Sequence, residues 1–147
     1  MIERYSREEM KKIWDIQTRF EYYLKVEIAV CKAYSELGVI SVNDYEQIYK
    51  LAKFDLTKIN IIESEIKHDF LAFLTNVNES LGDYAKYMHV GLTSSDVIDT
   101  AFALQIKESS DILFEDFDRL LKLLKEKAFI YKNTLCIGRT HGVQAEP

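Results

Sequence analysis

Three histidines provide the side chains of this sequence that are best suited to proton transfer near neutral pH. They are His68, His89 and His141, and each lies at or beside a break in an otherwise helical pattern. Binding and catalytic residues are often placed at such breaks, because rigid helices on either side hold them in position. A histidine at a break can also be purely structural, so its position alone leaves both interpretations open.

The break at residues 138–142, with the sequence GRTHG, has the residue types of a ligand-binding turn. Gly138 and Gly142 permit a tight, non-helical path and let the backbone approach a ligand closely. Thr140 adds a hydroxyl, and His141 adds a group that titrates near neutral pH. The alternative is a plain turn that happens to contain a histidine.

Two earlier breaks have the potential to bind anions. Lys67 and His68 precede a helix start, and Thr93, Ser94 and Ser95 stand where a long helix begins. Unpaired N–H groups and the helix dipole favour a carboxylate or phosphate at such an end. Plain capping, which needs only one of the three hydroxyls, is the alternative. The sequence contains no HExxH, GxSxG, P-loop or paired-cysteine pattern.

The elements that must position these residues are predicted to be helices. The sequence has only five glycines and one proline, and few breakers favour long helices. Ser6 and Glu9 have the spacing of a capping box. It predicts a helical pattern from about Met10 to Leu37, with Gly38 as the residue that ends it.

Three shorter helices are predicted next. Ser41 and Asp55 are residue types that cap helix N-termini, and Gly82 is suited to end the last of the three. We expect these helices at about 41–52, 56–67 and 69–81.

A long helix is predicted from about Ser95 to Tyr131. About 35 residues at ~1.5 Å each make a helix of roughly 50 Å, too long for the residues before it to cover. It requires a bundle supplied by further chain or by other subunits. The expected fold is all-α, with a small N-terminal helical domain (1–92) followed by the first long helix of a truncated central helical-bundle domain (93–147).

Composition limits the functional classes. Apolar residues make up 48% and charged residues 29% of the 147 residues, and the net charge is −5. This balance is typical of a soluble globular protein and argues against a nucleic-acid partner. Cys31 and Cys136 lack metal-ligand spacing, so we expect free thiols in a reducing compartment. With no signal-peptide pattern and no apolar run near ~20 residues, we expect a cytoplasmic protein without a membrane partner.

Four stretches of the chain together carry a family resemblance: MIERYSREEM (1–10), KHD (67–69), HVGLTSSDVIDTA (89–101) and GRTHGVQAEP (138–147). In this order and spacing they resemble the N-terminal part of the adenylosuccinate lyases, a family of the aspartase/fumarase superfamily. The resemblance covers the whole chain. It implies an all-helical fold and a homotetramer whose active sites are shared between subunits.

The resemblance also implies a reaction. Adenylosuccinate lyases remove fumarate by β-elimination from adenylosuccinate, giving AMP, and from SAICAR, giving AICAR, in purine biosynthesis. The reaction breaks a C–N bond by general acid–base catalysis, and the family requires no metal or organic cofactor.

Substrate-binding roles follow from the same resemblance. Arg4 and Tyr5 match the family's phosphate-binding pair. Thr93 and Ser94 match the residues that hold the succinyl carboxylates, and Thr140 matches a further substrate contact.

Proton-transfer roles are implied for two histidines. His141 matches the family's general acid toward the leaving nitrogen, and His68 is expected to contact the substrate and assist the acid chemistry, with Asp69 binding or orienting nearby. Lys67 stands where many relatives have arginine, so it keeps the charge and loses the bidentate fork. Gln144 replaces a histidine that is common in close relatives, and we expect it to be tolerated.

The family's serine base lies on a loop farther along the chain than Pro147. We therefore expect the 147 residues alone to be catalytically inactive. Two alternatives stay open: a related lyase of the argininosuccinate lyase or fumarase type, and a non-enzymatic helical interaction module. The pair Arg4–Tyr5 favours a nucleotide monophosphate over the substrates of the related lyases.

Overall fold

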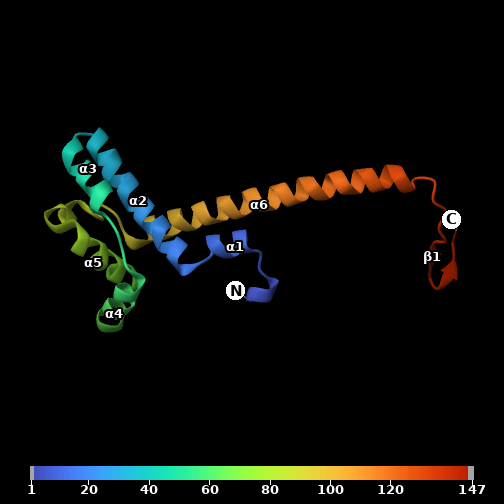
Figure 1. Cartoon of the computed structure of the whole chain (residues 1–147), viewed down its shortest axis with the longest axis horizontal. Helices are drawn as coiled ribbons and strands as arrows, with labels where there is room; N and C mark the ends of the chain where they lie inside the picture. Colours follow the sequence, from blue (N-terminus) through green and yellow to red (C-terminus); the bar gives the residue numbers. More distant parts are fainter. Residues whose placement is uncertain (1, 146–147) are drawn as a thin grey trace. The chain divides into compact units, whose positions relative to one another are not determined.

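The computed structural model describes residues 2–145, leaving out the side chain of Glu3. The chain forms two compact units, one up to Ser109 and one from Ser110 onward, and each is described by itself. The predicted all-α class is confirmed. The elements are η1 (Glu3–Tyr5), α1 (Glu8–Ile13), α2 (Ile16–Glu36), α3 (Val42–Leu51), α4 (Leu56–Ile66), α5 (Asp69–Leu81), η2 (Gly82–Tyr87), α6 (Ser94–Tyr131), β1 (Arg139–Thr140) and β2 (Val143–Gln144). Figure 1 labels the α-helices and β1.

The predicted capping box at the first helix is wrong. The Ser6 hydroxyl donates a hydrogen bond to the carbonyl of Ile2, at 2.8 Å, and α1 begins only at Glu8. The residue in the cap position is Arg7, which has an extended backbone and forms no side-chain cap. Ser6 is therefore used in the turn before the helix.

The helix predicted from Met10 to Leu37 is two helices. Asp15 has an extended backbone, and its carboxylate accepts a hydrogen bond from the Ile16 N–H at 2.7 Å, so it caps α2. The buried side-chain amide of Gln105 donates to the carbonyl of Ile13 at 2.7 Å, which supplies a partner at the end of α1. The predicted end is confirmed, because Gly38 has a φ of +73° directly after α2.

The next three helices begin and end close to their predicted positions. The Ser41 hydroxyl accepts from the Asp44 N–H at 3.0 Å at the start of α3. The Asp55 carboxylate accepts from the N–H groups of Thr57 and Lys58 at the start of α4. Gly82 follows α5 with a positive φ. Local capping chemistry therefore decides where these helices lie.

The core of the first unit is built around aromatic rings. Phe20 and Tyr23 of α2 pack against Phe70 and Phe73 of α5, with neighbouring ring centroids 5.4–5.7 Å apart. Both phenylalanines of α5 are almost fully buried. This cluster joins α2 to the first turns of α5, the helix that begins at Asp69 of the predicted Lys67–Asp69 site.

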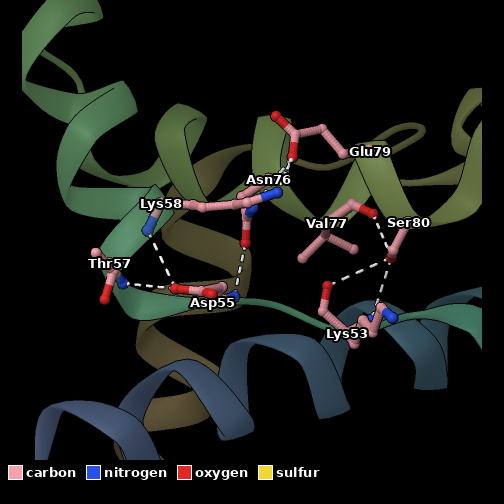
Figure 2. Close-up of polar contacts among 8 residues, drawn as sticks. All are labelled: Lys53, Asp55, Thr57, Lys58, Asn76, Val77, Glu79 and Ser80. Atoms are coloured by element: carbon pink, nitrogen blue, oxygen red, sulfur yellow. Dashed lines mark hydrogen bonds and ion pairs between the residues drawn. The ribbon is translucent and has the colours of Figure 1, made fainter.

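Polar contacts fix the link between α3 and α4 against α5 (Figure 2). The Asp55 N–H donates to the side-chain oxygen of Asn76 at 2.8 Å. The Ser80 hydroxyl lies 3.3 Å from both the N–H and the carbonyl of Lys53. In addition, α4 packs against α5. The turn that joins these two helices, at Lys67 and His68, is therefore flanked by two helices that are fixed against each other.

The second unit contains the C-terminal part of α6 and a β-hairpin. Thr140 pairs with Val143, and Arg139 pairs with Gln144, in antiparallel register. The two turn residues, His141 and Gly142, have φ values of +50° and +77°. A two-residue turn with positive φ at both positions matches the natural twist of a hairpin. The predicted tight, non-helical path is confirmed.

Large apolar side chains are exposed along the second unit's part of α6. Ten of them have relative exposures of 48–66%: Leu113, Phe114, Phe117, Leu120, Leu121, Leu123, Leu124, Phe129, Ile130 and Tyr131. Soluble proteins seldom leave so much continuous apolar surface in water. In the described residues, no helix combines the length and apolar character needed to cross a membrane.

Candidate functional site

His68 caps the N-terminus of α5. Its backbone is extended, and its ring nitrogen Nδ1 accepts a hydrogen bond from the Leu71 N–H at 3.2 Å. Histidine is not among the most favoured capping residues, and the preceding residue, Lys67, has a left-handed φ of +57°. The turn therefore depends on two residues in unfavourable roles, a pattern often found at functional sites.

The cap determines where the proton of the neutral His68 ring lies. An Nδ1 that accepts from a backbone N–H carries no proton, so the neutral ring is protonated at Nε2. Asp69 approaches Nδ1 only to 3.7 Å, and its carboxylate accepts from the Phe70 N–H at 2.7 Å. We therefore treat the His68–Asp69 contact as incidental and the cap as the bond that orients the ring. Nε2 is left as a donor for other groups.

The start of α6 uses a capping carboxylate. The helix begins at Ser94, and the Thr93 N–H donates to the carboxylate of Asp96 at 2.8 Å. Thr93 is in the cap position, and Asp96, three residues later, accepts from its backbone N–H as the N3 residue of a capping box does. One N–H at this end is already satisfied by an anion that belongs to the protein. An anionic ligand here would use the remaining N–H groups and the Thr93 and Ser94 hydroxyls.

A buried pair stands directly before this helix start. Glu27 of α2 is fully buried, and one of its carboxylate oxygens, Oε1, lies 2.6 Å from Nδ1 of His89. The other oxygen accepts from the His89 backbone N–H at 3.0 Å. His89 was noted from its position at a break, but Glu27 was not predicted. The sequence signal is a glutamate on the buried stripe of α2 formed by Phe20, Tyr23 and Cys31.

The environment of this pair alters two pKa values. Burial raises the pKa of Glu27, while the hydrogen bonds and charge of His89 act in the opposite direction. Burial and the Glu27 carboxylate raise the pKa of the Cys31 thiol to about 11. The thiol is therefore neutral, and this part of the core contains no thiolate nucleophile.

One ring contact brings two of the predicted segments together. The imidazole of His89 packs on Phe70 with ring centroids 5.1 Å apart, and Phe70 belongs to the first turn after His68 and Asp69. The segment before Thr93 therefore contacts the first turn of α5, the helix that His68 caps. These two breaks, far apart in the sequence, form one region of the first unit.

The other predicted residues belong to η1 and to the hairpin of the second unit. Arg4 and Tyr5 belong to η1, where both are exposed and the Arg4 guanidinium lies 4.7 Å from the centre of the Tyr5 ring. Thr140 and His141 are exposed in the hairpin of the second unit. The contacts of the first unit thus join two of the four predicted segments. Among the described residues, no group of His, Cys, Asp or Glu side chains is arranged to hold a metal ion.

A groove of about 830 Å³ runs between α2 and the first turns of α6. Its walls are mostly apolar, and Gly91 and Ser95 line the part next to Thr93 and Ser94. Asp96 and Asp99 also line it, with Lys25 as the lone basic residue in the lining. Two carboxylates and one ammonium group do not favour a multiply anionic ligand, so we do not assign the groove to such a ligand.

The comparisons with known proteins agree on a family and a fold. The family model described as Lyase matches residues 3–147. The chain is 50% identical to an adenylosuccinate lyase of Staphylococcus saprophyticus and 49% identical to one of Bacillus subtilis, over all 147 residues in both cases. The chain spans about a third of the length of these relatives, 34% in each.

Solved structures resemble the chain in fold. A fumarate lyase from Mesorhizobium matches 95% of the chain with a TM-score of 0.86 and 22% identity. A β-carboxy-cis,cis-muconate cycloisomerase from Acinetobacter calcoaceticus matches 95% with a TM-score of 0.85 and 23% identity. In both, the chain covers 34% of the solved protein. At these identities the likeness concerns the fold alone.

Proposed function

The chain belongs to the lyase family, and from that premise we propose that it is the N-terminal part of an adenylosuccinate lyase. The proposed reaction is β-elimination of fumarate from adenylosuccinate, giving AMP, and from SAICAR, giving AICAR, in purine biosynthesis. The observation that carries the proposal is 50% identity along the whole chain to an adenylosuccinate lyase. The resemblance of the four motif stretches supports it.

The substrate carries a phosphate and two carboxylates, so several anion-binding groups must converge on it. We assign the phosphate to Arg4 and Tyr5, a cation and a phenol on an exposed turn. We assign the succinyl carboxylates to Thr93 and Ser94, whose hydroxyls stand at the N-terminus of α6. Thr140 adds a further contact.

Two histidines have proton-transfer roles in this proposal. His141 acts as the general acid toward the leaving nitrogen, and histidine is the side chain most often used for proton transfer in catalysis. His68 assists from the α5 cap, where Nε2 carries the proton of the neutral ring and can donate to the substrate. Lys67 and Asp69 complete the substrate contacts at this turn. The group that removes the proton from carbon is assigned to none of the 147 residues.

The proposal includes an assembly. The exposed apolar side chains of α6 between Leu113 and Tyr131 are suited to packing against other long helices. We propose a homotetramer in which these helices pack together and each active site is shared between subunits. The boundary between the small domain and the central domain is proposed at residue 92, just before α6. The 147 residues alone are proposed to lack activity.

The test is direct. The complete gene product is purified and incubated with adenylosuccinate, and formation of AMP and fumarate is followed. Argininosuccinate and malate serve as substrates for the related lyases. Turnover of adenylosuccinate alone supports the proposal, and turnover of either comparison substrate alone would contradict it. The isolated 147-residue chain, assayed in the same way, is expected to give no product above the uncatalysed rate.

A further inference from the structure

Glu27 places a carboxylate in the core of the first unit. It is fully buried, and a buried carboxylate is strongly destabilising unless it is paired and hydrogen-bonded. An apolar residue of similar size would fill the same volume without that cost. The position of Glu27 therefore calls for a role beyond packing.

Both oxygens of Glu27 bind the same residue. One accepts from the backbone N–H of His89 at 3.0 Å, and the other lies 2.6 Å from Nδ1 of its ring. The first bond fixes the main chain, and the second fixes the ring. His89 has a φ of +60°, which is unfavourable for a residue with a side chain and persists only where the surroundings enforce it.

Two further residues on the same face of α2 hold the neighbouring chain. The Tyr34 hydroxyl donates to the Val90 carbonyl at 2.8 Å, and the Cys31 sulfur lies 3.7 Å from the Tyr87 carbonyl. A Cβ added to Gly91 would lie 2.9 Å from the Tyr34 hydroxyl, and Gly91 has a φ of +71°, so both features favour glycine here. The spacing of residues 27, 31 and 34 places all three on one side of the helix.

We propose that Glu27 is a positioning residue for the reaction. It holds Nδ1 of His89 as the protonated nitrogen, so that Nε2 of the neutral ring is an acceptor. It also fixes the path of residues 89–92, and thereby the placement of Thr93 and Ser94. This inference rests on the proposed function, because Thr93 and Ser94 are substrate-binding residues only within it.

The chemistry of the pair identifies a specific variant. Both groups that Glu27 binds are N–H donors, and a carboxylate can accept from both. Glu27→Gln keeps the shape, but only its carbonyl oxygen can accept, and its NH₂ group faces the other donor. A side chain that only fills space would tolerate this change of one atom. A positioning carboxylate would not.

The experiment uses the complete gene product. The variant is Glu27→Gln, and the matched control is Glu21→Gln, which removes an exposed carboxylate from the same helix. For Glu27→Gln we expect KM for adenylosuccinate to rise at least about tenfold and kcat/KM to fall by about 100-fold, the effect of a ~1 Å misplacement. The control should match wild type. Hydrogen exchange should accelerate in residues 87–94 and stay unchanged in α5.

The outcomes separate positioning from stability. Loss of folded protein alone would lower apparent kcat and leave KM unchanged, so a KM rise at an unchanged melting temperature supports positioning. A folded Glu27→Gln enzyme with wild-type KM, kcat and exchange would overturn the inference. If this variant does not fold, Tyr34→Phe replaces it, because it removes only the hydroxyl bound to Val90. A several-fold KM rise then supports the inference, and wild-type kinetics overturn it.

The two proposals can fail separately. If the wild-type protein does not cleave adenylosuccinate, the proposed function fails. Hydrogen exchange in residues 87–94 then decides the remaining question, whether Glu27 holds this segment. Faster exchange there in Glu27→Gln but not in Glu21→Gln supports the claim that Glu27 fixes this segment. Equal exchange in both variants overturns that claim.

Discussion

Residues 87–94 and the hairpin at 139–144 both contain a histidine in the left-handed region, but different forces hold them. His89 has a φ of +60° and is fixed by the buried Glu27. His141 has a φ of +50°, and its turn is completed by Gly142 at +77°. The first conformation depends on a core, and the second follows from the chemistry of a two-residue turn.

Within our proposal the two segments serve one site, and the difference suggests a distinct part for each. The conformation of the 87–94 segment is fixed by contacts within the first unit. The stability of that unit and the placement of Thr93 are therefore linked. The hairpin is formed locally, and its described side chains are exposed. Within our proposal, the hairpin therefore presents Thr140 and His141 to a site that other subunits complete. Substitutions in the aromatic core of the first unit should affect folding, whereas substitution of His141 in the hairpin should affect chemistry without affecting folding.

The largest expected effect is on chemistry in the hairpin. His141→Ala should lower kcat of the complete gene product by about 10²–10⁴-fold, the usual contribution of a placed proton donor. Its melting temperature should stay at the wild-type value, because the side chain is exposed. Steady-state kinetics on adenylosuccinate and a thermal melt test both statements. A near-normal kcat would remove His141 from the proposed catalytic residues.

The largest effect on folding is expected in the core. Phe73→Ala should destabilise the first unit by about 3–5 kcal/mol, because it leaves a cavity among four aromatic rings. Val143→Ala in the hairpin is the control and should change stability by no more than ~0.5 kcal/mol. Urea unfolding followed by circular dichroism gives both values. Equal destabilisation by the two changes would contradict the contrast between the regions.

An intermediate effect is expected at the N-terminal turn. Arg4→Ala should raise KM by about 10–100-fold, equivalent to the loss of a charged hydrogen bond of ~1.5–3 kcal/mol. kcat should change little, because the phosphate is remote from the bond that breaks. Kinetics on adenylosuccinate, with Arg7→Ala as the neighbouring control, test this prediction. An unchanged KM would exclude Arg4 from the phosphate site.

A smaller effect separates the two roles of His68. His68→Ala should lower stability by about 1 kcal/mol through loss of the α5 cap, whereas His68→Asn should restore most of it, since asparagine caps well. Both variants should lose activity, because neither side chain transfers protons as imidazole does. Denaturant unfolding measures the capping role of His68, and kinetics on the same variants measure its catalytic role. Recovery of activity in His68→Asn would reduce His68 to a structural role.

The smallest effect is expected at the departure from close relatives. Gln144→His should leave kcat and KM within about twofold of wild type, as for an exposed position of a hairpin. The same kinetic assay tests it. A gain of tenfold or more would mean that Gln144 limits the hairpin's function.

The parts of the fold that were predicted correctly depend on neighbouring residues. Ser41, Asp55 and Gly38 mark helix ends through local capping and positive φ, and these are visible in the sequence. The break at Asp15 was missed because apolar residues continue across it at helical spacing. The Gln105 amide that supplies a partner for Ile13 comes from a distant helix.

The candidate site also contains some residues that local sequence signals identify and others that only distant packing brings together. Lys67, His68, Thr93 and His141 lie at breaks and were singled out from the sequence. The pair of Glu27 and His89 was missed, because these residues are 62 positions apart and meet only through the packing of α2. A charged residue within an apolar stripe was the available signal. In our proposal, the way the hairpin meets the other segments depends on assembly, and neither kind of sequence signal can predict it.

The central claim is that the His68 turn and the hairpin that carries His141 belong to one composite site built from different subunits. Mixing His68→Ala and His141→Ala forms of the complete gene product, each inactive alone, and letting their subunits exchange tests it. Hybrid tetramers then contain some sites with both histidines intact, so the account predicts that activity on adenylosuccinate returns on mixing. Persistent inactivity, with subunit exchange verified by mass spectrometry and the wild-type enzyme active, would contradict it.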